Sequence, residues 1–283
     1  MSNILVTGGN GQLGSELKVI ADLYPNDTFF FTDLAELNIC QHKAVEVFVI
    51  EHKINIIINC AAYTAVDKAE KQFNLANKIN HLAVKNFARI AKLRNIKLVH
   101  ISTDYVFDGK NHQPYFEDDK PNPQSVYGKT KLDGEIAVQA INPANTIIIR
   151  TSWVYSNFGK NFMKTMLNLA EKSNEISVVT DQIGSPTNAF DLAKFILNIL
   201  PHISNKSVEI YNYSNEGVCS WYDFAVAIFE IKKINIKVNP ILSNQFHTTV
   251  KRPFFSVLNK SKIKDSYKIK IPYWRSSLLK TLK

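Results

Sequence analysis

A cluster of glycines near the N-terminus constrains this chain more than any other feature. The run TGGNGQLG spans residues 7–14 and follows the short apolar stretch 4–7, with Gly8, Gly11 and Gly14 in a GxxGxxG pattern. A strand that turns this tightly into a helix lets the backbone approach a pyrophosphate, and the free N–H groups of the helix point at it. In this strand–turn–helix context, the run predicts a dinucleotide-binding fold and not merely a tight turn.

The rest of the first half alternates two kinds of segment. Short runs rich in Ile, Val and Phe are typical of strands buried on both faces of a parallel sheet, and helix-compatible stretches separate them. This β-α-β spacing predicts an α/β fold, a Rossmann-type doubly wound parallel sheet, with residues 1–150 as its dinucleotide-binding domain. The expected strands are 4–7, 28–33, 54–59, 98–102 and 146–150, and the expected helices are 12–23, 42–52, 73–93 and 125–141.

After Arg150 the pattern loosens, and we expect residues 151–283 to form mainly a smaller mixed α/β substrate-binding domain. Its segments are expected to interleave with the first domain, and the strand 176–180 is expected to join the first domain's sheet. Ser220, with Asp223 three residues later, reads as an N-cap pair that opens a helix. The other expected elements are helices over 159–172 and from 187 to about 200, a strand near 208–213, and a short amphipathic helix at the C-terminal end.

The net charge of +9 lies in the second half of the chain. Residues 1–150 hold 16 Lys+Arg against 16 Asp+Glu, whereas residues 151–283 hold 18 against 9. Such a basic region suggests an anionic partner. No helix–turn–helix, zinc or RNA-recognition signature accompanies the lysines, so binding to nucleic acid is not predicted, and most of the lysines are expected to be simply exposed.

Several classes of protein are not expected. The three cysteines stand far apart, which favours a reducing compartment over a disulfide framework. No apolar run approaches the roughly 20 residues of a membrane span, and no signal peptide is recognisable, so we expect a soluble cytoplasmic protein without a membrane partner. The seven histidines show no HxxxH or HExxH spacing, and no metal site is predicted from them.

An acidic residue ends the second expected strand. Asp33 lies 22 residues after Gly11, where a carboxylate bonds the ribose 2′-hydroxyl of NAD. No Lys or Arg lies between Lys18 and Lys43 to meet a 2′-phosphate, so the sequence favours NADH over NADPH. Both cofactors stay open, because Asp33 is also explained as a solvated turn residue. At the end of the third strand, the small residues of 60–62 would let the cofactor approach.

The fourth helix carries a candidate catalytic pair. Tyr127 and Lys131 are spaced i, i+4 and therefore lie on one helix face. A phenol has a pKa near 10, and a neighbouring ammonium helps it to exchange a proton near neutrality. Thr103, at the carboxyl end of the fourth strand, can hydrogen-bond a substrate carbonyl.

Together, the glycine turn, Thr103, Tyr127 and Lys131 resemble the extended short-chain dehydrogenase/reductase family. Longer strings are similar to one branch of it, the dTDP-4-dehydrorhamnose reductase family, and they follow one another over essentially the whole chain. The strings are NCAAYTAVDKAE (59–70), STDYVFDG (102–109), YGKTKLDGE (127–135), RTSWVY (150–155) and DQIGSPT (181–187).

The resemblance implies an NADH- or NADPH-dependent oxidoreductase that reduces the C4 ketone of dTDP-4-dehydro-L-rhamnose, the last step of dTDP-L-rhamnose synthesis. Tyr127 would give a proton to the oxygen, Lys131 would tune Tyr127, and Thr103 would orient the oxygen. The expected cofactor-binding positions are Gly8, Gly11, Gln12, Leu13, Gly14, Asp33, Cys60, Ala61, Ala62, Tyr63, Tyr127 and Lys131. The expected substrate-binding positions are Thr103, Asp104, Tyr105, Trp153, Asp181, Gln182 and Arg252.

Alternatives to this interpretation stay open. The chain is also compatible with another nucleotide-sugar 4-ketoreductase or epimerase, or with a non-catalytic NAD(P)-binding regulatory subunit, because fold does not fix function. Retention of Thr103, Tyr127 and Lys131 together argues against the non-catalytic alternative. Some relatives pair through a Mg²⁺-bridged homodimer, but the carboxylates that such a bridge needs are not assignable from this sequence.

Overall fold

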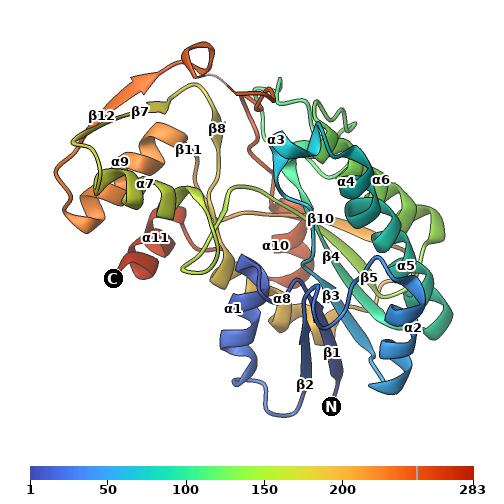
Figure 1. Ribbon diagram of the computed structural model, residues 1–283. Helices are drawn as coiled ribbons and strands as arrows, with labels where there is room; N and C mark the ends of the chain where they lie inside the picture. Colours follow the sequence, from blue (N-terminus) through green and yellow to red (C-terminus); the bar gives the residue numbers. More distant parts are fainter. Residues whose placement is uncertain (247) are drawn as a thin grey trace.

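The computed structural model describes residues 1–246 and 248–283, and its larger lobe is built on a parallel sheet (Figure 1). The strand order is β10-β5-β4-β3-β1-β2, and every neighbouring pair is parallel. The predicted doubly wound α/β fold is therefore confirmed. The strands are β1 (Asn3–Thr7), β2 (Thr28–Thr32), β3 (Ile56–Asn59), β4 (Lys97–Thr103), β5 (Thr146–Thr151) and β10 (Glu209–Tyr213).

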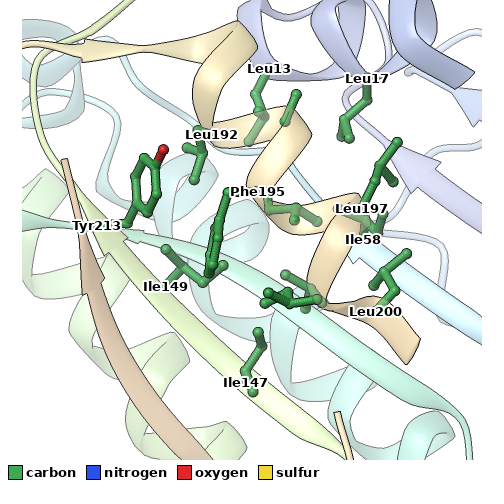
Figure 2. Close-up of a cluster of buried hydrophobic side chains, with 14 of the residues drawn as sticks. Leu13, Leu17, Ile58, Ile147, Ile149, Leu192, Phe195, Leu197, Leu200 and Tyr213 are labelled. Atoms are coloured by element: carbon green, nitrogen blue, oxygen red, sulfur yellow. The ribbon is translucent and has the colours of Figure 1, made fainter. Parts of the chain in front are cut away.

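Helices cover both faces of this sheet. Along β1, Ile4 and Val6 belong to one buried cluster and Leu5 to another, because successive side chains of a strand point to opposite faces. The first cluster is formed with α1 (Gln12–Ala21) and α8 (Ala189–Ile199) and is shown in Figure 2. The opposite face is covered by α2 (His42–Glu51), α5 (Ala83–Arg94) and α6 (Val126–Ile141).

The helix predicted over 73–93 is interrupted. The structure has α4 (Phe73–Asn77), a π-helical turn (Lys78–Leu82), and then α5. The turn carries the buried Asn80, whose amide accepts from the N–H of Tyr63 at 2.8 Å and donates to the Tyr63 carbonyl at 3.1 Å and to Thr130 Oγ1 at 3.1 Å. These bonds join the loop after β3 to α6. The π-helical turn depends on these tertiary contacts, so the hydrophobic periodicity of the sequence does not predict it.

The smaller lobe is formed mainly by residues beyond β5. Its core contains aromatic and apolar side chains of α7 (Phe162–Ala170), α9 (Trp221–Lys232) and α11 (Trp274–Leu282). The predicted N-cap of α9 is confirmed as a reciprocal capping box between Ser220 and Asp223. Other short elements of the chain include α3 (Val66–Ala69), β6 (Val154–Tyr155), β8 (Ile183–Gly184), β9 (Thr187–Asn188), β11 (Cys219–Ser220) and α10 (Ser261–Tyr267), together with 3₁₀ turns at Asp104–Val106, Leu200–His202 and Ser243–Gln245.

The strand expected at 176–180 exists, but its predicted place was wrong. It is β7 (Glu175–Val179), which pairs in parallel with β12 (Lys237–Ile241) in a separate small sheet, whereas β10 occupies the edge of the main sheet beside β5. The physical reason lies in burial. Glu175 and Ser177 of β7 are exposed, whereas Ile176 and Val178 are buried. This alternation suits a two-stranded ribbon with one solvent-exposed face and not a strand that is buried on both faces of a parallel sheet.

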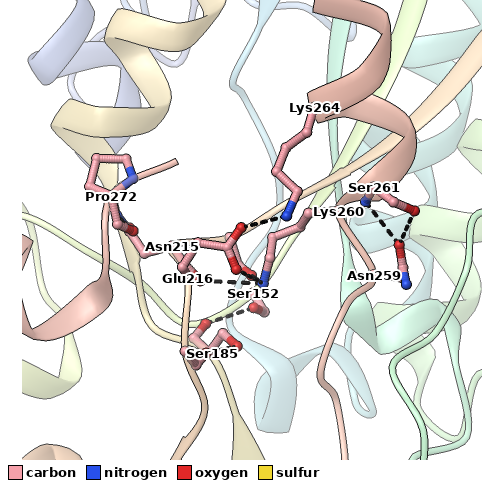
Figure 3. A network of polar contacts seen from close by, with 11 residues as sticks. Ser152, Ser185, Asn215, Glu216, Asn259, Lys260, Ser261, Lys264 and Pro272 are labelled. Carbon is pink, nitrogen blue, oxygen red and sulfur yellow. Dashed lines mark hydrogen bonds and ion pairs between the residues drawn. The ribbon is translucent and has the colours of Figure 1, made fainter. Parts of the chain in front are cut away.

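Polar contacts join the segment after β5 to the C-terminal part of the chain (Figure 3). Ser152 Oγ donates to the carbonyl of Ser185 at 2.8 Å. Nearby, Glu216 pairs with Lys264 at 3.0 Å and with the buried Lys260 at 3.7 Å. Some cations of the basic half are therefore engaged within the chain.

Within the part of the chain that the structure describes, no helix has the length and apolar character needed to cross a membrane.

Candidate active site

A cleft of about 880 Å³ lies along the carboxyl edge of the sheet. Residues that directly follow β1, β2, β3, β4 and β5 line it, together with residues of α6. In doubly wound sheets this edge is where ligands bind. Of the positions predicted from the sequence, the cleft brings together Gly8, Gly11, Gln12, Leu13, Asp33, Cys60, Ala61, Ala62, Thr103, Asp104, Tyr105, Tyr127, Lys131 and Trp153.

The glycine turn is shaped by close backbone contacts. Gly8 has φ +69°, and a Cβ there would lie 2.7 Å from the backbone nitrogen of Ala61, so a side chain is excluded for both reasons. A Cβ on Gly14 would collide with the carbonyl oxygen of Gly8. Gly14 therefore stays outside the cleft lining but allows α1 to pack against the turn. Because Gly11 is the N-cap residue, no side chain of its own covers the first N–H groups of α1.

The residues after β2 and β3 form the next part of the cleft. The carboxylate of Asp33 accepts from the backbone N–H of Asn10 at 3.2 Å and of Leu34 at 2.8 Å, which fixes it beside the glycine turn. Cys60 lies in the cleft wall, and burial raises the pKa of its thiol to about 12. Tyr63 is not part of the lining, since its hydroxyl donates to Gln72 at 2.8 Å and its N–H to Asn80.

The predicted catalytic residues meet where β4 ends and α6 begins. Thr103 is the last residue of β4, and its Oγ1 donates to Asp104 Oδ1 at 3.1 Å. Tyr127 lies in the first turn of α6, which Ser125 caps by accepting from the N–H of Gly128 at 3.1 Å. A Cβ on Gly128 would collide with the carbonyl of Tyr105, so glycine lets α6 approach the end of β4.

The surroundings of Tyr127 keep it protonated. Burial holds the pKa of its phenol well above the ordinary value, and the charge of Asp104 and the neighbouring Tyr105 act in the same direction. A hydrogen bond with Thr103 opposes them. The ring of Tyr105 packs edge-on to that of Tyr127, with centroids 5.5 Å apart. At neutral pH Tyr127 is therefore a proton donor, which is the form that a carbonyl reduction needs.

Lys131 is fully buried behind the tyrosine. Its Nζ donates to the carbonyl of Ile101 at 2.6 Å and lies 3.5 Å from Nε2 of His100. Burial lowers the pKa of Lys131 to about 8, whereas the charge of Glu135 and the Cys60 thiol raise it. The pKa of His100 is held well below its usual value by burial and by Lys131, so the imidazole is neutral.

A row of buried polar groups continues from His100 into the sheet. The ring Nδ1 of His100 lies 3.0 Å from the amide nitrogen of Asn59, and the Asn59 carbonyl accepts from Thr7 Oγ1 at 2.7 Å. The parallel register places Thr7 beside Asn59 and Asn59 beside His100. This row of polar groups was not predicted from the sequence. Its only signal was polar residues at the ends of otherwise apolar strands.

One turn after Lys131, a buried ion pair attaches α6 to the sheet. Glu135 and Arg150 are almost completely buried, and the carboxylate accepts from Arg150 Nη2 at 2.7 Å and Nε at 3.1 Å. Ser102 Oγ also donates to Glu135, and Arg150 Nη1 donates to the carbonyl of Glu117 at 3.0 Å. This ion pair was not predicted from the sequence, although two charged residues inside predicted buried elements were a signal.

The predicted substrate residues divide into two groups. Asp104, Tyr105 and Trp153 line the cleft, and burial raises the pKa of Asp104 to about 6 against hydrogen bonds with Ser256 and Thr103. Asp181 and Gln182 are not in the lining. Both bond to Ser243, whose Oγ donates to Asp181 at 2.6 Å and accepts from Gln182 Nε2 at 2.9 Å.

Arg252 lies at the border of the cleft. Its Nη1 donates to the hydroxyl of the cleft residue Tyr105 at 3.3 Å, and its Nη2 forms an ion pair with Asp67 at 2.5 Å. The pair connects α3 of the larger lobe with the segment after β12. Arg252 is thus a cation of the basic half that reaches a predicted substrate residue.

Over residues 1–246 and 248–283, no group of three or more His, Cys, Asp or Glu side chains is arranged to hold a metal ion. His247, one of the seven histidines, lies outside the described residues.

Comparison with known proteins places this geometry among reductases. The model of the family described as "RmlD substrate binding domain" matches residues 1–283. A dTDP-4-dehydrorhamnose reductase from Sinorhizobium fredii is 38% identical over 282 residues, 97% of this chain and 94% of that protein. A crystal structure of a dTDP-4-dehydrorhamnose reductase from Clostridium acetobutylicum superposes with a TM-score of 0.92 at 43% identity, covering 99% of this chain and 98% of that chain. Another from Bacillus anthracis, in complex with NADP, gives a TM-score of 0.93 at 37% identity over the same shares.

Proposed function

Because the chain belongs to the RmlD substrate binding domain family, we propose that it is a dTDP-4-dehydrorhamnose reductase. It reduces the C4 ketone of dTDP-4-dehydro-β-L-rhamnose with NADH or NADPH and yields dTDP-β-L-rhamnose. The observation that carries this proposal is the convergence of Thr103, Tyr127 and Lys131 in the cleft that begins at the glycine turn.

The residues of the cleft fit a dinucleotide. The absence of a Cβ at Gly8 and the uncovered N-terminus of α1 leave backbone N–H groups for a pyrophosphate. Asp33 would accept from the adenosine ribose, and Ala61 and Ala62 would border the cofactor without filling its space. When bound, the reduced nicotinamide supplies the hydride.

Tyr127 is the proton donor in this proposal. Its half-buried phenol holds a proton at neutral pH, and this proton passes to the ketone oxygen as negative charge develops there. Thr103 orients that oxygen through its hydroxyl. The Lys131 ammonium stabilises the phenolate that remains and reaches the ribose hydroxyls, while the carbonyl of Ile101 holds it in place.

The substrate would occupy the end of the cleft near β4 and β5. Asp104, Tyr105 and Trp153 are proposed to contact the sugar, and Arg252 to contact the pyrophosphate after exchanging its partner Asp67 for the phosphates. Asp181 and Gln182 are proposed to act through the loop that holds Ser243, because their side chains are engaged there.

The test is oxidation of NADH and NADPH by the purified protein with dTDP-4-dehydro-L-rhamnose, alongside other 4-keto sugar nucleotides. We expect turnover with the rhamnose precursor. Faster turnover of a different sugar nucleotide would support the alternative reductase or epimerase, and cofactor binding without turnover would support a non-catalytic subunit.

The Tyr127→Phe variant tests the assignment of the proton donor. The ring is retained, so cofactor binding should remain, whereas turnover should fall by roughly 10²–10⁴-fold, the usual contribution of a positioned general acid. Activity equal to that of the unaltered protein would remove Tyr127 from the mechanism.

A further inference from the structure

Trp153 has an unusual backbone for an aromatic residue. It lies two residues beyond Thr151, which is paired in register with Thr103, so it stands beside the proposed reaction centre. Its φ of +49° lies in the left-handed region that bulky side chains avoid. Such a conformation persists only where the surrounding structure imposes it. Something in the tertiary structure therefore holds this side chain in place.

Two neighbours fix the indole of Trp153. The ring of Trp221 stacks on it, with centroids 3.5 Å apart and planes 9° from parallel. At Gly184, a Cβ would lie 2.6 Å from Cε2 and 2.7 Å from Cζ2 of the indole, so the ring occupies the space of the missing side chain. The hydrogen bond from Ser152 to Ser185 joins the residues next to this contact (Figure 3).

Trp221 is itself firmly placed. It is the first residue of α9 and lies between Ser220 and Asp223, the two members of the capping box, and the centroid of the Phe162 ring lies 4.5 Å from that of its own ring. Trp153 lines the cleft, whereas Trp221 and Gly184 do not. Two residues of the smaller lobe therefore contact a side chain that forms part of the cleft wall.

We propose that Trp221 and Gly184 are positioning residues that hold Trp153 as a preformed wall for the sugar of the substrate. This inference rests on the proposed function. A wall fixed before the ligand arrives lowers the cost of ordering on binding, and an indole suits the C–H face of a pyranose. It also gives a reason for the glycine in the DQIGSPT string, which no cofactor or substrate contact explains.

The experiment compares Trp221→Leu and Gly184→Ala with the unaltered enzyme. Losing an aromatic stack should raise the KM for dTDP-4-dehydro-L-rhamnose roughly two- to ten-fold, and a Cβ at Gly184 should displace the indole with a similar result. The kcat and the affinity for NADH should stay within about two-fold, as expected for uniform binding. In Trp221→Phe the KM should stay close to that of the unaltered enzyme, because an aromatic ring is kept beside Trp153.

Trp274→Phe is the matched control. Trp274 belongs to the same hydrophobic cluster and is 4% exposed, but it neither lines the cleft nor stacks on Trp153. Its substitution should lower stability and leave the KM unchanged. The ultraviolet circular dichroism couplet of the stacked indoles should disappear in Trp221→Leu and persist in Trp274→Phe.

The outcomes separate this inference from the proposed function. An active enzyme whose KM is unchanged in both Trp221→Leu and Gly184→Ala would overturn the inference and leave the function intact. A couplet that survives in Trp221→Leu would overturn it as well. An unaltered protein that does not turn over the substrate would overturn both.

Discussion

The buried pair of Glu135 and Arg150 provides the sharpest test of how the site is supported. Both side chains are at most 2% exposed, and they share a bidentate contact at the point where α6 meets β5. Removing one partner leaves an uncompensated charge inside the protein, which costs about 3–5 kcal/mol. Since domains are stable by only about 5–15 kcal/mol, Glu135→Leu or Arg150→Met should shift the unfolding midpoint strongly.

The double variant should behave differently from either single variant. With both charges gone, no ion remains unpaired, and the remaining cost is the unmet hydrogen bonds of Ser102 and the Glu117 carbonyl, about 1–3 kcal/mol for each buried group. We therefore expect the double variant to be no less stable than either single variant, with a coupling energy of at least about 2 kcal/mol. Urea unfolding followed by circular dichroism measures all four proteins. Additive losses would refute the reasoning.

The same pair has a functional consequence through Lys131. The charge of Glu135 raises the pKa of Lys131, which burial brings down to about 8. Glu135→Gln removes this charge and leaves Arg150 unpaired, so the pKa of Lys131 should fall further. The alkaline limb of the pH–rate profile should then move to lower pH. An alkaline limb that stays in place while stability falls would show that Glu135 supports only the fold.

Three further predictions concern the cleft. Asp33→Ala should raise the KM for NADH roughly ten-fold or more, the value of a hydrogen bond to a charged group, and should affect NADPH much less; equal losses would contradict a ribose contact. Gly14→Ala should destabilise the protein by about 1–3 kcal/mol in thermal unfolding, because the new Cβ would collide with the Gly8 carbonyl oxygen. Gly11→Ala is the control: its Cβ would lie 3.1 Å from the same oxygen, so it should lower the free energy of unfolding by less. Burial raises the pKa of Asp104 from 3.8 to about 6, so its contribution to stability is present below pH 3.8 and is lost as the pH rises through about 6. The free energy of unfolding of Asp104→Asn, relative to that of the unaltered protein, should therefore rise by up to about 3 kcal/mol between pH 4 and pH 7. The variant should also lose the acid limb of the activity profile. The same difference in stability at both pH values would contradict this.

The sequence by itself determined the five strands of the sheet from β1 to β5 and the chemical centre. The glycine turn, the apolar strands and the i, i+4 spacing of Tyr127 and Lys131 are local patterns, set by steric limits on the backbone and by the periods of helix and strand. The β-α-β spacing gives a parallel sheet, and the strands of a parallel sheet all present their carboxyl ends at one edge, where ligands bind. That is why Asp33 and Thr103, each at the carboxyl end of a predicted strand, could be assigned from the sequence to cofactor and substrate binding.

Only the tertiary structure decided which distant segments meet. The choice of β10 over β7 for the edge of the sheet, the pairing of Glu135 with Arg150 and the stack of Trp153 on Trp221 join residues that no local pattern relates. Burial is the physical reason in each case. A charge or a strained aromatic residue is tolerated inside a protein when the fold supplies its partner, and that partner is chosen by tertiary packing rather than by the neighbouring sequence.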